Sequence, residues 1–207
     1  MKIIISKTKD FVKERLMNEK SGHDYWHTMR VYNNAIDIAK EEQKENKLDM
    51  MAVELGSLLH DIADHKFGYD DEDRKEIIGK FLIKLDVDSQ TIDNVIHIAN
   101  NISFKNKDKK NTINTLEGKI VQDADRLDAI GAIGIARTFT FGGFYKRDMY
   151  NPIDEDNNEH TIAHFYEKLL LLKDRMNTKT GKQKALKRHE YMKEFLDQFY
   201  DEWEGKR

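Results

Sequence analysis

The chain has 207 residues, and its 35 basic and 38 acidic side chains give a formal net charge of −3. This length suits one domain, and the interspersed charges form no basic patch for nucleic acid. There is no cysteine and no apolar run of 18 residues, which excludes thiolate metal sites and membrane-spanning helices. We therefore expect a cytoplasmic protein that binds neither membranes nor nucleic acid.

The single proline in the chain indicates the fold class. Proline interrupts helices and marks loops and edge strands, so a helical chain has least room for it. Apolar residues also recur at steps of three and four along most of the sequence. We predict an all-α fold, a helical bundle.

Five helices are predicted in the first half of the chain, at residues 6–20, 23–44, 49–66, 71–85 and 88–100. The first begins at Ser6, and the third and fifth begin with the aspartates Asp49 and Asp88 as caps. In the second helix a stripe that includes Trp26 is predicted to be buried, and His27 falls on the adjoining face.

A central helix is predicted from Asn114, as its cap, to Arg137, with Glu117 completing a capping box. It is apolar nearly all round, yet it carries three aspartates, Asp123, Asp125 and Asp128. A helix of this kind is buried, so we expect at least one aspartate to be buried with it. An ionised buried aspartate requires a partner, and a cation can supply one.

The C-terminal part of the chain carries no chemical cluster. Residues 139–150, which contain two glycines and several aromatic residues, predict a loop or lid. A long helix is expected over residues 160–178, and a last helix with Leu186 inward is expected after Gly181. We expect these two helices to serve packing or an oligomer surface, such as that of a homodimer.

The densest group of titratable side chains is His60-Asp61-Ile62-Ala63-Asp64-His65-Lys66, directly after two leucines. Unpaired charges are costly to bury, so this group indicates metal coordination or catalysis rather than packing. Imidazole and carboxylate donors suit Mn²⁺, Fe²⁺, Ni²⁺ or Mg²⁺. Adjacent helical residues project about 100° apart, so an ion shared by His60 and Asp61 must lie near the end of the helix or against its edge.

Three motifs occur in the order His, His-Asp, Asp, at residues 27–31 (HTMRV), 60–64 (HDIAD) and 123–128 (DADRLD). This order resembles the HD superfamily of metal-dependent phosphohydrolases. With Ser103-Phe104-Lys105 and the GAIG motif at residues 131–134, the chain is similar, more narrowly, to bacterial stand-alone HD proteins of the YpgQ and YedJ type.

The resemblance covers about residues 20–145, which it identifies as the core of a single HD-type domain over residues 1–207. A C-terminal helical extension at about residues 156–204 is expected to pack against this core. The implied activity is hydrolysis of a phosphate ester or anhydride, of a nucleotide or related small phosphate, by a metal-activated water. The family pattern makes the metal ligands His27, His60, Asp61 and Asp125.

The resemblance also implies roles for residues around the ligands. Asp64 takes the place of the acid that activates water or protonates the leaving oxygen, with a capping or salt-bridged aspartate as the alternative. Cations are needed to bind phosphate. The candidates are Lys66, Lys105 and Arg137, and the alternative for each is an ordinary surface charge. Asp128 and His23 are expected to orient ligands.

Some alternatives stay open at the level of the sequence. His97 lies where some superfamily members hold a second metal, but a satisfied helix histidine or a hydrogen-bond donor to the substrate explains it as well. A non-catalytic HD module that binds a nucleotide signal is the alternative function, although it would lack a ligand or the acid after Asp61. A di-iron oxygenase would need more inward histidines, and a purely helical interaction protein leaves the buried aspartates unexplained.

Overall fold

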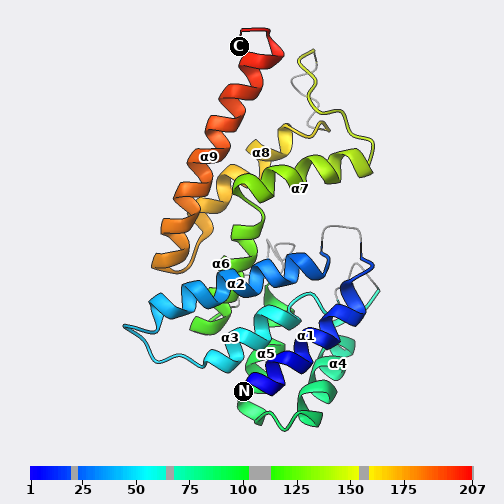
Figure 1. Ribbon diagram of the computed structural model, residues 1–207, viewed down its shortest axis with the longest axis vertical. Coiled ribbons are helices and arrows are strands. Elements are labelled where there is room, and N and C mark those ends of the chain that lie inside the picture. Colours follow the sequence, from blue (N-terminus) through cyan, green and yellow to red (C-terminus); the bar gives the residue numbers. More distant parts are fainter. Residues whose placement is uncertain (20–22, 64–67, 103–112, 154–158, 207) are drawn as a thin grey trace. The chain divides into compact units, whose positions relative to one another are not determined.

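The computed structural model describes residues 1–19, 23–63, 68–102, 113–153 and 159–206. Every regular element in these residues is a helix, which confirms the predicted all-α fold. The chain divides into two compact units, residues 1–125 and 126–207 (Figure 1). The single HD-type domain stays a prediction. Among the described residues, no helix is both long and apolar enough to cross a membrane.

Aspartate side chains cap the starts of several helices in the first unit. Its helices are α1 (Lys2–Leu16), α2 (Tyr25–Glu42), α3 (Met50–Leu59), α4 (Asp71–Lys84), α5 (Ser89–Asn101) and most of α6 (Leu116–Asp128). Asp24, Asp49 and Asp88 accept hydrogen bonds from backbone N–H groups in the first turns of α2, α3 and α5. Such side chains satisfy N–H groups that have no partner within the helix. The predicted caps Asp49 and Asp88 are thus confirmed.

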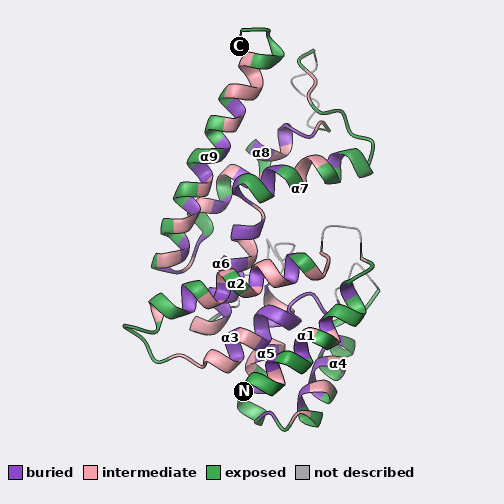
Figure 2. Ribbon diagram, viewed as in Figure 1, coloured by how far each residue is buried: buried purple, intermediate pink, exposed green. Residues whose placement is uncertain are grey.

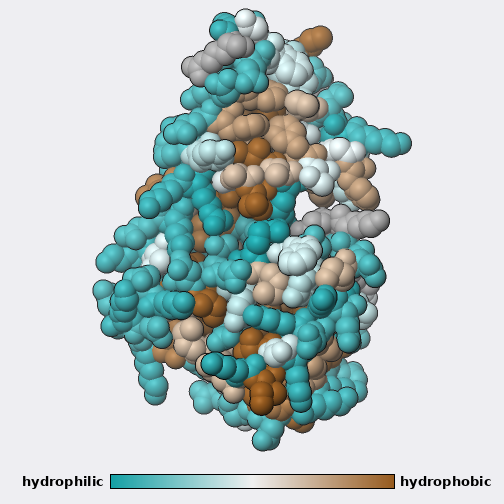
Figure 3. All heavy atoms as spheres, in the orientation of Figure 1, coloured by the Kyte–Doolittle hydropathy of each residue, from teal (hydrophilic) through white to brown (hydrophobic). Residues whose placement is uncertain are grey.

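Helix α3 lies at the centre of the first unit, where it packs against α1, α2 and α5. Leu55, Leu58 and Leu59 are fully buried, and Figure 2 shows this part of the unit mostly in the colour of buried residues. Hydrophilic residues cover most of the face drawn in Figure 3. Each buried leucine contributes about 1.5–3 kcal/mol relative to an exposed one. Burial of these leucines therefore holds the C-terminal end of α3 in place within the core.

Asp49, the N-cap of α3, also forms hydrogen bonds to α5 and α6. Its backbone N–H donates to Glu117 Oε1 of α6 at 2.9 Å, and the Thr91 hydroxyl of α5 donates to its Oδ2 at 2.9 Å. The predicted capping box at α6 is wrong in this respect, because Glu117 binds Asp49 instead. Thr115, rather than Asn114, caps α6 through its hydroxyl, which accepts a hydrogen bond from a backbone N–H three residues on.

Three further predictions for the first unit need correction. Helix α3 ends at Leu59, before the predicted end of this helix. Helix α1 begins at Lys2 rather than at Ser6. In α2, Trp26 is 60% exposed, although the sequence predicted it to be buried. The buried residues of α2 instead are His27, Thr28, Val31, Ala35, Ile38 and Ala39. The buried stripe is shifted by one residue because the face that carries His27 is the one turned towards the end of α3.

The second unit begins with the last turn of α6 and is held together by aromatic packing. Its further helices are α7 (Gly131–Phe144), α8 (Ala163–Glu167), the 3-10 helix η2 (Leu169–Arg175) and α9 (Lys179–Trp203). Helix α9 packs against α7 and η2. Ring centroids lie 5.9 to 6.4 Å apart among Phe139, Phe165, Phe195 and Phe199. Edge and offset contacts of this kind add to the burial of apolar area.

The predicted central helix is divided in two. Helix α6 ends at Asp128 and α7 begins at Gly131, whose φ of +77° is in the left-handed region that favours glycine. A Cβ atom at Gly134 would lie 2.3 Å from the Ala129 carbonyl oxygen, so the α7 backbone passes close to the preceding turn. The GAIG motif therefore forms the first turn of a second helix, and the helix break lies directly before it.

Three predictions for the second unit are also wrong. The segment from residue 139 to Phe144 is helical rather than a loop or lid. The predicted helix over residues 160–178 is interrupted at Lys168, whose φ of −139° is not helical. Leu186 on α9 is exposed instead of inward, since α9 turns Ala185 and His189 to the interior. Apolar spacing alone did not reveal these positions.

We expect Gly134→Ala to destabilise the protein, because its Cβ would meet a backbone carbonyl that cannot rotate away. Overpacking of this kind costs about 1–3 kcal/mol, and sometimes more. Gly143→Ala is the matched control in the same helix, since nothing lies within 4 Å of its Cβ position. Chemical unfolding followed by circular dichroism measures both, and equal midpoints for the two variants would contradict the close approach at Gly134.

Candidate metal centre

Two imidazoles and two carboxylates converge inside the first unit. His27 comes from the first turn of α2 and Asp125 from α6, while His60 is the C-cap residue of α3 and Asp61 follows it in a turn. His27 is fully buried, His60 is 2% exposed and Asp61 is 5% exposed. Because α3 ends at Leu59, neighbouring residues of the chain can direct both side chains to one place.

The donor atoms lie at closely similar separations. His27 Nε2 is 3.3 Å from Asp61 Oδ2, 3.5 Å from Asp125 Oδ1 and 3.4 Å from His60 Nε2. His60 Nε2 is 3.5 Å from Asp61 Oδ2. Donors bound to one ion at about 2.0–2.2 Å are roughly 3–3.5 Å from each other. This spacing suits a divalent ion held by His27, His60 and Asp125, and Asp61 Oδ2 lies within 3.5 Å of both imidazoles.

The hydrogen bond at the other nitrogen of His60 determines which nitrogen can coordinate. His60 Nδ1 lies 2.8 Å from the Ser57 carbonyl oxygen, and a carbonyl can only accept, so Nδ1 carries the hydrogen. Nε2 is then the nitrogen of His60 that remains for coordination, and it lies 3.5 Å from Asp61 Oδ2. A positive charge here, whether a proton on the imidazole or a metal ion, offsets the buried charge of the carboxylate. This is the arrangement expected of a metal-ligating histidine.

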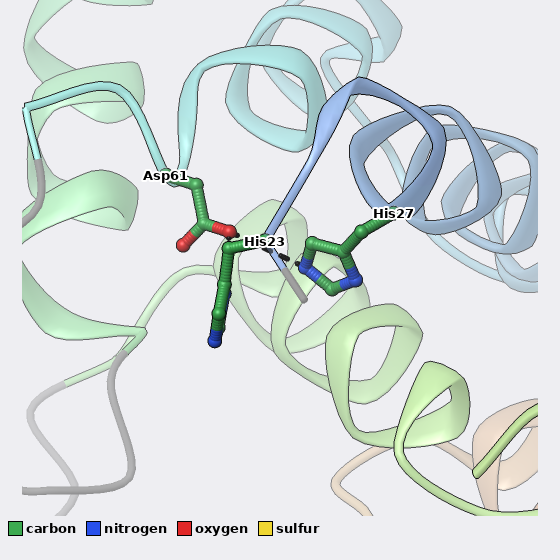
Figure 4. Close-up of side chains that lie close together, drawn as sticks. All are labelled: His23, His27 and Asp61. Atoms are coloured by element: carbon green, nitrogen blue, oxygen red, sulfur yellow. Dashed lines mark hydrogen bonds and ion pairs between the residues drawn. The ribbon is translucent and has the colours of Figure 1, made fainter. Parts of the chain in front are cut away.

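His23 adds a third imidazole on the other side of Asp61. Its Nδ1 donates to Asp61 Oδ2 at 2.8 Å, and its side chain is 38% exposed. Figure 4 shows His23 and His27 both approaching the Asp61 carboxylate. The sequence suggested that His23 orients His27, whereas in the structure its hydrogen bond is to Asp61. His23, His27 and Asp61 form a second group with spacing suitable for a metal.

The surroundings of Asp61 keep its carboxylate ionised. Burial by itself raises the pKa of Asp61, but the charge of His60 and the hydrogen bonds from His23 and His27 outweigh it. Together they hold the pKa well below its usual range. An ionised carboxylate is the form that binds a metal.

The three aspartates of α6 differ in burial. Asp123 and Asp128 are buried, whereas the Asp125 side chain is 32% exposed. The expectation that at least one of them is buried is confirmed. Catalytic metal sites keep an open position for water or substrate, unlike closed structural sites. The partial exposure of Asp125 fits a site of the open kind.

Asp128 and Arg137 bind each other within the second unit. Arg137 Nη1 lies 2.7 Å from Asp128 Oδ2, whose side chain is 2% exposed. Arg188 of α9 donates to the neighbouring Leu127 carbonyl. The charge of Arg137, predicted to bind phosphate, is thus offset by a carboxylate. The roles predicted for Asp128 and Arg137 at the site stay predictions.

Some of the predicted site residues cannot be placed. Asp64, Lys66 and Lys105 lie outside the described residues. His97 is described: it is half-buried on α5, its Nε2 has no hydrogen-bond partner among the described residues, and it belongs to neither group with metal-like spacing. The second-metal alternative for His97 thus has no support among the residues that the structure describes.

Sequence reasoning missed Arg74, a buried arginine of α4 that donates to the Ala63 carbonyl just after the His60-Asp61 pair. A signal for it exists in the sequence. Arg74, Ile78 and Leu82 are spaced by four residues, so the arginine falls on the apolar face of its helix. A charge in that position indicates a buried polar contact.

The chain is similar to known proteins over most of its length. The HD domain model matches residues 25–130. The Bacillus subtilis protein YpgQ is 40% identical over 192 residues, which cover 91% of this chain and 88% of YpgQ. The crystal structure of an HD-superfamily hydrolase from Bacillus thuringiensis has a TM-score of 0.79 and 43% identity, and the alignment covers 97% of each chain.

A crystal structure of YpgQ in complex with ADP is also similar, with a TM-score of 0.78 and 34% identity over 98% of this chain and 100% of that one. The predicted resemblance is thereby confirmed, both along the sequence and in the fold. The match includes the segments that carry His27, His60, Asp61 and Asp125. The chain belongs to the HD domain family.

Proposed function

We propose that the protein is a metal-dependent phosphohydrolase that acts on a nucleotide or a related small phosphate ester or anhydride. The observation that carries this proposal is the convergence of His27, His60, Asp61 and Asp125 at separations suited to one divalent ion. The similarity to an HD-superfamily hydrolase supports the reaction class. The ADP complex of YpgQ supports a nucleotide as the substrate class.

The chain's own residues prepare this site for a cation. His60 presents a lone pair because its other nitrogen is held by Ser57, and Asp61 stays ionised with His23 hydrogen-bonded to it. A divalent ion bound there would lower the pKa of a coordinated water towards neutrality and polarise a phosphoryl oxygen. Asp125 leaves an accessible side for the substrate.

The proposal includes roles for residues around the ligands. Asp64 would transfer the proton to the leaving oxygen, and His23 and Asp128 would orient ligands. Phosphate oxygens carry charge that cations must offset, and the residues proposed for this are Lys66, Lys105 and Arg137. Arg137 already donates a hydrogen bond to the Asp128 carboxylate. Phosphate binding by Arg137 would therefore compete with this contact.

The donor set limits which ion is expected. Imidazole suits transition metals, while carboxylate suits Mn²⁺ and Mg²⁺. We therefore propose Mn²⁺, Mg²⁺, Ni²⁺ or Fe²⁺ as the cofactor. Mn²⁺ is a suitable first probe because it accepts both kinds of donor.

We expect purified protein to bind Mn²⁺ and His60→Ala to weaken this binding by more than about 100-fold, the upper end of what loss of an outer partner of a ligand costs. Isothermal titration calorimetry measures the dissociation constant. His164→Ala removes an imidazole from the second unit and serves as the control. Unchanged affinity of His60→Ala would remove His60 from the metal site.

We expect Mn²⁺-dependent release of phosphate or pyrophosphate from at least one nucleotide in a panel of mono-, di- and triphosphates. Chelation should abolish this release and added Mn²⁺ should restore it. In Asp125→Ala the rate should fall by roughly 100-fold or more, since metal ions supply several kcal/mol of transition-state stabilisation. Asp93→Ala, an exposed aspartate of α5, is the matched control.

Two outcomes of this assay argue against the proposal. Full activity in both His60→Ala and Asp125→Ala would show that the site lies elsewhere. Protein that binds Mn²⁺ yet releases nothing from any nucleotide would favour a non-catalytic module that binds a nucleotide signal.

A further inference from the structure

Arg74 is a charged residue in the apolar interior of the first unit. It is 3% exposed and lies on the face of α4 that also buries Ile78 and Leu82. Burying a charge is costly unless it is paired and hydrogen-bonded. An apolar side chain at this position would complete the core without that cost, so the packing of α4 alone does not account for an arginine.

The guanidinium of Arg74 binds mainly uncharged oxygens. Its Nε donates to the Ala63 carbonyl at 3.2 Å, and its Nη1 donates to the Ala99 carbonyl at 3.1 Å and to Asn100 Oδ1 at 3.2 Å. The Asp71 carboxylate is 3.5 Å away and 57% exposed, so water weakens that interaction. Arg74 therefore connects the turn after α3 with the end of α5.

Both carbonyls that Arg74 binds lie at or just beyond the end of a helix. Ala99 lies in the last turn of α5, where carbonyl oxygens have no N–H group further along the helix and carry the negative end of its dipole. Ala63 lies in the turn beyond α3. A buried cation can satisfy both at once, and the planar fork of arginine suits two acceptors in different directions.

Ala63 has an unfavourable backbone conformation. Its φ is +56°, in the left-handed region, where the Cβ atom of an ordinary residue approaches the following carbonyl. Such conformations persist where the surroundings hold them in place. The hydrogen bond from Arg74 supplies this restraint, and Ala63 is only two residues beyond Asp61.

We propose that Arg74 is a positioning residue for the metal centre: by holding the left-handed turn at Ala63, it keeps Asp61 directed at the cluster formed with His27 and His60. This inference rests on the proposed metal-binding function. Arg74 acts through the backbone of the turn. Without it, the turn relaxes towards conformations that alanine prefers, and Asp61 loses its alignment with His60.

The experiment compares Arg74→Met with the double variant Arg74→Met, Ala63→Gly. Methionine has a similar length and suits the core, and replacing a buried charge with an apolar residue often leaves stability unchanged or higher. Glycine adopts a positive φ without strain, so it should restore the turn where the arginine is missing. Lys75→Met, at an exposed position of the same helix, is the matched control for the lost charge.

Two measurements on the full chain separate positioning from stability. Calorimetry with Mn²⁺ gives the affinity, and hydrogen exchange of the metal-free protein reports on residues 58–63. We expect Arg74→Met to weaken Mn²⁺ binding by about 10–100-fold, as for other residues that orient ligands, and to speed exchange in residues 58–63. The double variant should recover at least part of the affinity, and Lys75→Met should match the wild type.

The possible failures are distinguishable. Wild-type protein that does not bind Mn²⁺ would overturn the metal centre and this inference together. Wild-type binding that Arg74→Met retains would overturn the inference alone. Lost affinity that Ala63→Gly does not recover, with unchanged exchange in residues 58–63, would also overturn it, because Arg74 would then act on the fold in general rather than through the turn.

Discussion

The first unit depends on one buried carboxylate oxygen, Asp61 Oδ2, which faces nitrogens of His23, His27 and His60 within 3.5 Å. Burial removes water from this charged oxygen at a cost in free energy, which hydrogen-bond donors or a cation must offset. The capping aspartates, the leucines of α3 and the Asp49 contact to α6 all bring the three helices to the positions that this requires. The contacts that hold the helices in place therefore also place the side chains of the candidate metal centre.

Much of this arrangement follows from local features of the sequence. Asp49 and Asp88 precede apolar periodic segments, so the starts of α3 and α5 could be predicted, and the motif order identified His27, His60, Asp61 and Asp125 as one group. The elements that were not predicted depend on tertiary contacts. Gly131 breaks the central helix through a left-handed turn that apolar periodicity cannot register.

Two side chains show the limits of reasoning from spacing. Trp26 falls on an apolar repeat but is exposed, because the polar His27 beside it takes the interior position for the site. Arg137 contacts Asp128, a residue that lies nine positions earlier and across a helix break, and the spacing did not predict this contact. In both cases the position of the side chain depends on a tertiary contact, which the spacing of apolar residues does not reveal.

The donors of the candidate metal centre are far apart in the sequence, and nearly half of the chain lies between His27 and Asp125. The unfolded chain cannot hold them together without a large loss of conformational entropy. A cation that binds only the assembled cluster therefore stabilises the folded unit in proportion to its affinity and concentration. Ion availability in the cell would then govern the abundance of the folded protein as well as its chemistry.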